Sequence, residues 1–268
     1  MSAADQLVKT LEPTPPTRPE VPAPVLSLRR RWVNYLVFIP LVALATCFYG
    51  TISLICGIWD ASGRQQHAVA AVWARMLLRI ALSPVTLEHP ERLPVGAAVY
   101  ASNHLSYYDT PVLFGKLPFQ FRILAKAPLW KIPFIGWYLD RSGQVPIDQT
   151  SARAGITSLG RGARTLQAGM PMVIFPEGGR AYNGKLQPML AGAAWMAIKA
   201  QVPLVPLTLV GTYELLPIHV YALKPRPVKL IVGEPISTVG MSTRDAEILT
   251  ERLRAVIHET YIAEHNKP

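Results

Sequence analysis

An α/β domain preceded by an apolar helical unit is the fold class that the sequence predicts. Beyond residue 84, short apolar runs of strand length alternate with longer helical patterns. This alternation is typical of a sheet covered by helices on both faces. Before that point, the stretch from Trp32 to Trp59 contains no Asp, Glu, Lys, Arg or His. Because about 20 apolar residues cross the hydrocarbon layer of a membrane, we expect this stretch to be helical and associated with lipid.

The composition favours a membrane surface over nucleic acid as the partner. The chain has 268 residues, 50% of them hydrophobic, and a formal net charge of +10. A basic protein attracts phosphate groups, either in nucleic acid or in anionic lipid. The arginines here are scattered among apolar residues and do not alternate with stacking aromatic residues, so no nucleic-acid module is recognisable. Cys47 and Cys56 lie in the apolar stretch, and no Cys/His spacing predicts a zinc site.

The region before the α/β domain divides into a tail and a lipid-associated unit. Residues 1–28 are rich in proline and poor in apolar residues, so we expect a flexible tail. Residues 29–84 are expected to form membrane-associated helices. Three arginines, 29–31, precede the apolar stretch, and a tryptophan at each of its ends suits anchoring at the membrane interface.

The sequence leaves open whether this unit crosses the membrane. Arginines before an apolar helix favour the cytoplasm for that end, and a single crossing would then put the rest of the chain outside. Pro40, Gly50 and Gly57 allow the stretch to bend back or to lie within one leaflet. A second helix is predicted over residues 66–82. It places Arg75 and Arg79 on one face, where they can meet lipid head groups.

Residues 85–268 are expected to form one α/β domain. Its strands are short and apolar, and its helices carry the longer periodicity. The predicted strands cover residues 85–88, 97–101, 121–125, 144–147, 171–175, 204–210 and 228–232, and the predicted helices cover residues 110–116, 151–168, 189–200 and 243–264.

His104 and Asp109 are the first candidates for chemistry. They follow a predicted buried strand and stand five residues apart, and no other histidine of the chain has an acidic residue five positions on. A histidine oriented by a carboxylate can act as a general base toward a hydroxyl. The alternative is structural, because Asp109 before Thr110 and Pro111 is also a suitable helix N-cap. Ser102 and Ser106 are possible nucleophiles, but neither lies in a Gly-x-Ser-x-Gly elbow.

A second candidate segment runs from Phe175 to Arg180 and follows a short predicted strand. Gly178 and Gly179 let backbone N–H groups approach an anion, and Arg180 can fork onto phosphate oxygens. The alternative is a tight turn with a surface arginine. The segment has no Gly-Lys-Ser/Thr ending, so it is a poor match for a nucleotide-binding P-loop.

Four blocks in this order resemble the 1-acylglycerol-3-phosphate acyltransferase (PlsC-like) family of glycerolipid acyltransferases. That family carries an Asn-His-x-x-x-x-Asp block, a Lys-containing block, a Phe-Pro-Glu-Gly-Thr-Arg-like block and a Val-Pro-x-x-Pro block. The chain carries the matching segments at residues 103–109, 125–137, 175–180 and 202–206. The resemblance covers residues 85–235 approximately and implies a mixed sheet flanked by helices, with an N-terminal helical unit embedded in one leaflet.

Two positions depart from the family pattern. Gln149 stands where the family usually has arginine, and Gly179 replaces the usual Thr or Ser. Arg141 or Arg153 is a possible source of the missing charge. Both departures bear on the contacts to phosphate and on the identity of the acceptor, whereas the His104–Asp109 pair is intact.

The resemblance implies an enzyme that moves a fatty acyl group from acyl-CoA or acyl-carrier protein to the 2-hydroxyl of lysophosphatidic acid, giving phosphatidic acid. His104 would be the general base and Asp109 its orienting partner. The substrate-binding residues would be Lys126, Glu177, Gly178, Gly179 and Arg180. No metal and no cofactor is expected beyond the acyl-CoA or acyl-carrier-protein co-substrate.

The expected location follows from the same resemblance. The protein would sit in the inner or plasma membrane, with the catalytic domain, residues 85–268, facing the cytoplasm. Three alternatives stay open: an acyltransferase for another lysophospholipid or lyso-ornithine lipid, a non-catalytic lipid-binding protein, and a metal-independent esterase.

Overall fold

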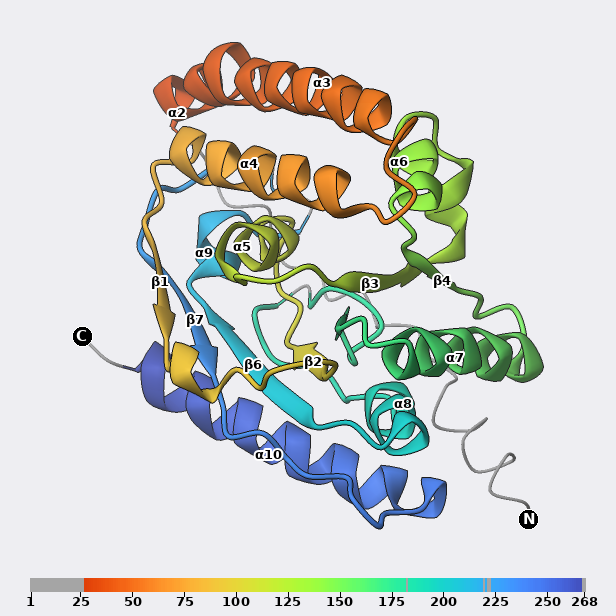
Figure 1. Cartoon of the computed structure of the whole chain (residues 1–268). Helices are drawn as coiled ribbons and strands as arrows, with labels where there is room; N and C mark the ends of the chain where they lie inside the picture. The colour runs from red at the N-terminus through yellow and green to blue at the C-terminus, as the bar shows by residue number, and fades with distance from the viewer. Residues whose placement is uncertain (1–26, 182, 219, 221–222, 267–268) are drawn as a thin grey trace.

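The computed structural model describes residues 27–181, 183–218, 220 and 223–266. All but the last two residues of the predicted proline-rich tail, 1–28, lie outside this described part. The remainder forms a layered α/β structure in which helices cover both faces of one sheet (Figure 1).

The sheet has seven strands in the order β1-β7-β6-β2-β5-β3-β4. β6 and β7 pair antiparallel, while the other neighbouring strands pair parallel, so the sheet is mixed, as the resemblance implied. The strands are β1 Val85–Glu88, β2 Val99–Ser102, β3 Arg122–Lys126, β4 Val145–Ile147, β5 Met172–Ile174, β6 Leu204–Val210 and β7 Val228–Val232.

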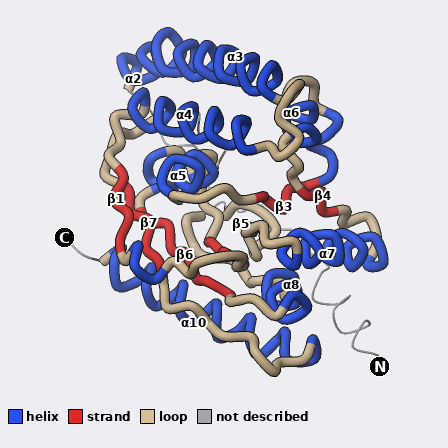
Figure 2. Tube along the Cα trace, in the orientation of Figure 1, coloured by secondary structure: helices blue, strands red, loops and turns tan. Residues whose placement is uncertain are grey.

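The long helices lie in two groups, one on each face of the sheet (Figures 1 and 2). On one face of the sheet lies α5 Asp109–Lys116, with α4 Arg64–Ile80 packed on it and the continuous helix α2–α3 outermost. On the other face lie α7 Ala152–Gln167, α8 Gly192–Ala200 and α10 Ala246–His265. The continuous helix comprises α2 Leu28–Val33, a π-helical turn Asn34–Phe38, and α3 Ile39–Cys56. Shorter elements are α6 Ile135–Arg141, α9 Thr212–Leu215 and 3-10 turns at Pro90–Arg92, Ala127–Lys131 and Thr243–Asp245.

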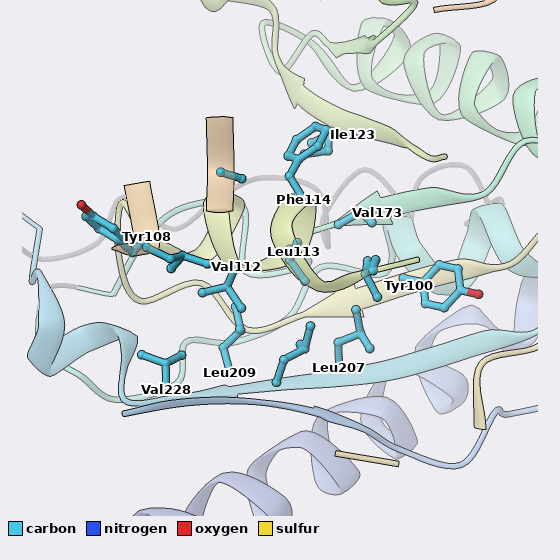
Figure 3. Close-up of a cluster of buried hydrophobic side chains, with 14 of the residues drawn as sticks. Tyr100, Tyr108, Val112, Leu113, Phe114, Ile123, Val173, Leu207, Leu209 and Val228 are labelled. Carbon is cyan, nitrogen blue, oxygen red and sulfur yellow. The ribbon is translucent and has the colours of Figure 1, made fainter. Parts of the chain in front are cut away.

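Alternation along the strands builds two cores. Val99 and Ala101 of β2 face the core under α7, α8 and α10, whereas Tyr100 faces the core under α4 and α5. Because successive strand side chains point to opposite faces, this fully buried strand serves both cores. Figure 3 shows the α5 side, where Val112, Leu113 and Phe114 pack against the sheet.

The outer helix is apolar and poorly covered. In the part of the chain that the structure describes, Leu28–Cys56 is the one helix long and apolar enough to cross a membrane, and its most apolar window is 6% buried. Asn34 ties this helix to the α/β domain, because its amide oxygen accepts from the Leu223 N–H at 2.8 Å. Its amide nitrogen donates to the Arg30 carbonyl within the helix at 2.9 Å. The second predicted helix is present as α4, and Trp73 on α4 donates to Thr46 on α3 at 3.1 Å.

Two differences from the predicted elements have clear causes. The helix expected from residue 189 begins at Gly192, because the N–H of Leu190 is bound to the carbonyl of Pro176 at 2.8 Å and holds that stretch in the preceding loop. The 3-10 turn Ala127–Lys131 and α6 were not predicted. They are compact because Gly136 packs directly on the Trp130 carbonyl, where a Cβ atom would overlap the oxygen.

Asn103 fixes the end of β2 against β6. Its side-chain amide donates to the Leu209 carbonyl at 2.9 Å and accepts from the Leu209 N–H at 2.7 Å, and the residue is completely buried. The amide therefore extends the strand ladder by two bonds at the position next to His104.

We predict that Asn103→Leu lowers the stability of the folded chain by about 2–5 kcal/mol, because it leaves two buried backbone groups of Leu209 unpaired. Urea unfolding in detergent micelles measures this loss. Asn183→Leu, at an exposed loop position, is the control and should leave the midpoint unchanged. Equal midpoints for both variants would show that the Asn103 bonds do not hold β2 to β6.

Candidate active site

His104 and Asp109 form a buried pair at the end of β2. The His104 Nδ1 atom lies 2.8 Å from Asp109 Oδ2. The same carboxylate oxygen accepts from the N–H groups of Leu105 at 2.7 Å and Ser106 at 2.8 Å. Tyr108 is the N-cap residue of α5, and no side chain caps this helix. The N-cap interpretation of Asp109 is therefore wrong: its carboxylate organises the histidine loop.

The His104 ring is held in one orientation. Its side chain is 11% exposed, and the ring stacks on Phe175 with centroids 3.9 Å apart and an interplanar angle of 15°. With Nδ1–H directed at a carboxylate, the neutral tautomer leaves the lone pair on Nε2. The pKa of His104 lies below its usual value of 6.5: burial lowers it most, the Asp109 bond and charge raise it, and Arg180 and Lys126 lower it further. The imidazole is thus an unprotonated base at neutral pH.

Glu177 joins the second motif to the histidine loop. One carboxylate oxygen accepts from the His104 N–H at 2.8 Å, and the other accepts from the Gln187 N–H at 2.8 Å. Burial raises the pKa of Glu177 to about 8, against the lowering effect of these two N–H donors. Both oxygens are used by the backbone, so this geometry suits a positioning role better than contact with substrate.

Arg180 lies against the same loop. Its Nε donates to the Ser106 carbonyl at 3.2 Å, and its guanidinium carbon lies 4.6 Å from the centre of the Tyr107 ring. These contacts hold Nε and one face of the group, while the two terminal nitrogens remain suited to forked contact with an anion. Burial is the main cause that lowers the pKa of Arg180.

Lys126 completes the positive charge around the base. It is the exposed last residue of β3, and its charge is one of the influences that lower the pKa of His104. The structure therefore brings together, at the carboxyl ends of β2, β3 and β5, the predicted pair and the cations Lys126 and Arg180. This edge is where ligands bind in open α/β sheets.

The glycine turn leaves room beside these cations. Gly178 has a φ of +67°, which disfavours other residues, and nothing lies within 4 Å of the position that a Cβ at Gly179 would take. The amide nitrogen of Gln149 lies 3.8 Å from the equivalent position at Gly178, so Gln149 belongs to this turn. Arg141 instead donates to the Gly57 carbonyl at 3.4 Å, beside the outer helix. Arg153 is exposed in the first turn of α7.

The two serines beside His104, Ser102 at the end of β2 and Ser106 in the loop, have structural partners. Ser106 donates to the Leu216 carbonyl at 2.7 Å and accepts from the Tyr108 N–H at 3.1 Å, while Ser102 donates to the Asn103 carbonyl at 3.2 Å. Both are completely buried. Within the described residues, no group of three His, Cys, Asp or Glu side chains could hold a metal ion.

Sequence reasoning missed three residues of this site. Phe175 stacks on the base, Tyr107 supports Arg180, and Asn103 anchors the loop. All three lie inside the matched blocks at residues 103–109 and 175–180. Their place in these blocks was the available signal, but their roles depend on contacts that the sequence spacing does not reveal.

The known proteins that the chain resembles are acyltransferases. Residues 84–210 match the family model described as Acyltransferase. The chain is 32% identical over 197 residues to the chloroplast 1-acyl-sn-glycerol-3-phosphate acyltransferase LPAT1 of Arabidopsis thaliana, covering 72% of this chain and 53% of that relative. It is 27% identical over 249 residues to the 1-acyl-sn-glycerol-3-phosphate acyltransferase of Cocos nucifera, covering 89% and 80%. The chain thus spans about half the length of the Arabidopsis relative.

A solved structure has the same fold. The crystal structure of the 1-acyl-sn-glycerophosphate (LPA) acyltransferase PlsC from Thermotoga maritima superposes with a TM-score of 0.75. The match covers 89% of this chain and 99% of that one, at 24% sequence identity. The likeness extends beyond the α/β domain into the N-terminal helices, because it covers more of the chain than residues 85–268.

The raised pKa of Glu177 predicts a pH-dependent stability. Its value of about 8 in the folded chain exceeds its usual 4.5, so between these pH values the folded chain keeps a proton that the unfolded chain has released. The free energy of unfolding should therefore fall as pH rises from about 4.5 to about 8 and then level off. In the Glu177→Gln chain this dependence on pH should disappear, so that its free energy of unfolding differs from that of the unchanged chain by an amount that varies with pH. Chemical unfolding in detergent from pH 5 to 9 measures both curves.

Glu234→Gln is the control for this measurement, because Glu234 is 76% exposed and pairs with Arg92 at the surface. It should keep the slope of the unchanged chain. A Glu177→Gln chain with that same slope would mean that Glu177 is already ionised in the folded state at low pH.

Proposed function

We infer that this chain belongs to the PlsC-like acyltransferase family, and from that premise we propose that it acylates the 2-hydroxyl of lysophosphatidic acid to give phosphatidic acid. The donor is acyl-CoA or acyl-carrier protein. The observation that carries the proposal is the buried His104–Asp109 pair, 2.8 Å apart, beside the cations Lys126 and Arg180. A base for a hydroxyl and an anchor for a phosphate are what this reaction needs.

In the proposed mechanism, His104 Nε2 takes the proton of the acceptor hydroxyl as that oxygen attacks the thioester carbonyl. A new C–O bond forms, and the carbonyl electrons move onto oxygen. Asp109 stabilises the imidazolium through the Nδ1–H bond, as in a serine-hydrolase triad with the substrate hydroxyl in place of the serine. Collapse of the tetrahedral intermediate breaks the C–S bond, and the departing thiolate takes the proton from Nε2. No acyl-enzyme forms.

The acceptor must be held so that its hydroxyl reaches the base. Arg180 is already braced by Ser106 and Tyr107, so little side-chain freedom is lost when it grips a phosphate. Lys126 adds a second charge, and the N–H of Gly179 is a further donor in the open turn. The N–H of Gly178, which the sequence also predicted as a donor, is instead bound to the Phe175 carbonyl at 3.1 Å. Glu177 supports the site by fixing the His104 backbone.

The outer helix supports a membrane location for the reaction. Lysophosphatidic acid carries its acyl chain in a bilayer, and the exposed apolar surface of Leu28–Cys56 can hold the enzyme there. We propose that the protein lies in the inner or plasma membrane and that its α/β domain faces the cytoplasm, where acyl-CoA and acyl-carrier protein are found. The proline-rich tail, the helices to residue 84 and the catalytic domain from residue 85 are the proposed divisions of the chain.

A second acceptor class is favoured by one observation. Gln149, which lies beside Gly178, is neutral, and the space at Gly179 is open. Both features would admit a head group that is larger or less charged than a phosphate monoester, such as another lysophospholipid or lyso-ornithine lipid. The reaction at the hydroxyl would be unchanged.

We predict that His104→Ala lowers turnover by at least about a hundredfold, the lower end of the effect of a general base. His89→Ala is a matched control, because His89 also contacts a carboxylate, Glu91 at 3.1 Å, but at the surface. Turnover is measured with purified protein, lysophosphatidic acid and acyl-CoA or acyl-carrier protein. A His104→Ala enzyme that stays as active as His89→Ala would exclude His104 as the base.

We predict that Arg180→Ala raises the KM for lysophosphatidic acid about 10- to 100-fold, the value of a lost charge-assisted hydrogen bond. The KM for an uncharged monoacylglycerol should not change. Arg254→Ala, which removes an exposed arginine paired with Glu251 on α10, is the control.

An Arg180→Ala enzyme with unchanged saturation by lysophosphatidic acid would rule out the phosphate anchor. The same assay separates the two acceptor classes when a panel of lyso-lipids is offered and products are identified by mass spectrometry. Phosphatidic acid as the main product supports the first proposal, and a different main product supports the second.

A further inference from the structure

A surface patch outside the N-terminal helices carries large exposed apolar side chains. It lies on residues 127–141, the 3-10 turn and α6 that connect β3 to β4. Phe134 is 62% exposed and Trp137 55% exposed, with Leu129, Ile132 and Ile135 exposed beside them. A contiguous patch of this kind marks an interaction site more often than an ordinary protein surface.

The backbone presents these side chains outward in a fixed way. Phe134 has a φ of +63°, an unusual and strained conformation for a bulky residue. The Ile135 N–H is bound to the Pro133 carbonyl at 2.7 Å, and the Gly136 N–H to the Ile132 carbonyl at 2.7 Å. Gly136 packs on the Trp130 carbonyl, and the Phe134 and Trp137 rings lie 5.0 Å apart. The fold thus holds the aromatic rings together at the tip of the segment.

The patch adjoins the outer helix. A cavity of about 600 Å³ separates the two, lined by Leu54 and Ile58 on one side and by Trp130, Gly136 and Trp137 on the other. Arg141 bridges to the Gly57 carbonyl just beyond the end of α3. Figure 1 shows α6 beside that end of α3. The exposed residues Ile55, Ile58 and Trp59 therefore continue the same apolar surface.

Basic residues flank the patch. Lys126 and Lys131 lie at its start and Arg141 at its end, against the single acid Asp140. Apolar and aromatic side chains bordered by cations match the boundary between acyl chains and anionic head groups. A bilayer is therefore the occupant that this chemistry fits.

We propose that residues 127–141 form a second membrane-inserting element, which sinks Phe134, Ile135 and Trp137 into the leaflet beside the end of α3. Acyl chains then fill the cavity between α3 and α6. Because Lys126 immediately precedes this element, insertion holds the phosphate-binding edge of the sheet at the lipid surface. The inference concerns membrane contact and does not depend on which acceptor the enzyme uses.

The test places a fluorescent probe on the patch. Cys47 and Cys56 are the only cysteines of the chain, so a Cys47→Ala, Cys56→Ala chain with Phe134→Cys accepts an environment-sensitive label at one position. The matched control is Ile248→Cys in the same background, because Ile248 is 71% exposed on α10, at the opposite face of the sheet. Both full-length chains are reconstituted into vesicles of phosphatidylcholine and phosphatidylglycerol.

The two probes should respond to different quenchers, the probe at position 134 to brominated lipid and the probe at position 248 to aqueous iodide. The probe at position 134 should lose most of its quenching by aqueous iodide and be quenched by lipids brominated on the acyl chain. Interfacial elements sink about 5–10 Å into the boundary, within reach of such bromines. The probe at position 248 should be quenched by iodide alone. A Trp137→Cys chain provides a second reading from the patch if Phe134→Cys does not fold.

Two outcomes would overturn the proposal. Equal iodide quenching at positions 134 and 248 would show that the patch stays in water. Protection from iodide without quenching by brominated lipid would show that protein, such as a second copy of the chain, covers the patch. Neither result depends on catalysis, so the acyltransferase proposal is tested separately.

Discussion

The site depends on one buried oxygen, Oδ2 of Asp109. It accepts from the His104 ring and from the N–H groups of Leu105 and Ser106, all within 2.8 Å. A single carboxylate thereby shapes the loop, selects the imidazole tautomer and keeps Nε2 available. Asp109 is completely buried, and the three partners of its Oδ2 atom offset part of the cost of removing this polar group from water. Burial and cations together keep the imidazole neutral, while Asp109 limits how far its pKa falls.

Contacts between segments that are distant in sequence hold this arrangement in place. Asn103 bonds to β6 across 106 residues, Glu177 bonds to the His104 N–H across 73, and Arg180 bonds to the Ser106 carbonyl across 74. Each contact ends on the backbone of the histidine loop or next to it. The loop is therefore rigid before substrate arrives, which lowers the cost of reaching the reactive geometry. The second motif contributes Arg180, proposed as the phosphate anchor, and Glu177, which holds the backbone of His104.

Much of the fold was readable from the sequence, because the strands are short apolar runs bounded by turns. β1, β6 and β7 have the predicted limits, and α4, α5, α7 and α10 lie where periodicity placed them. The segment 127–141 escaped prediction because its shape comes from the close approach of Gly136 to Trp130 and from the unusual φ of Phe134. The proximity of His104 and Asp109 followed from their five-residue spacing. The partners of Glu177 could not be predicted, because the Gln187 and His104 N–H groups meet it only after the sheet has formed.

For His104 to act as the base, its ring must be neutral at pH 7, with hydrogen on Nδ1 and a lone pair on Nε2. Nitrogen-15 NMR of the protein in detergent micelles, with isotope-labelled histidine, measures this state directly. The signal of His104 is identified as the one that is missing from the spectrum of a His104→Gln chain. The predicted spectrum has a protonated Nδ1 and an unprotonated Nε2 at pH 7, and the pKa for forming the imidazolium lies below that of an ordinary histidine. A ring that is protonated on both nitrogens at pH 7, or that carries its hydrogen on Nε2, would contradict the account.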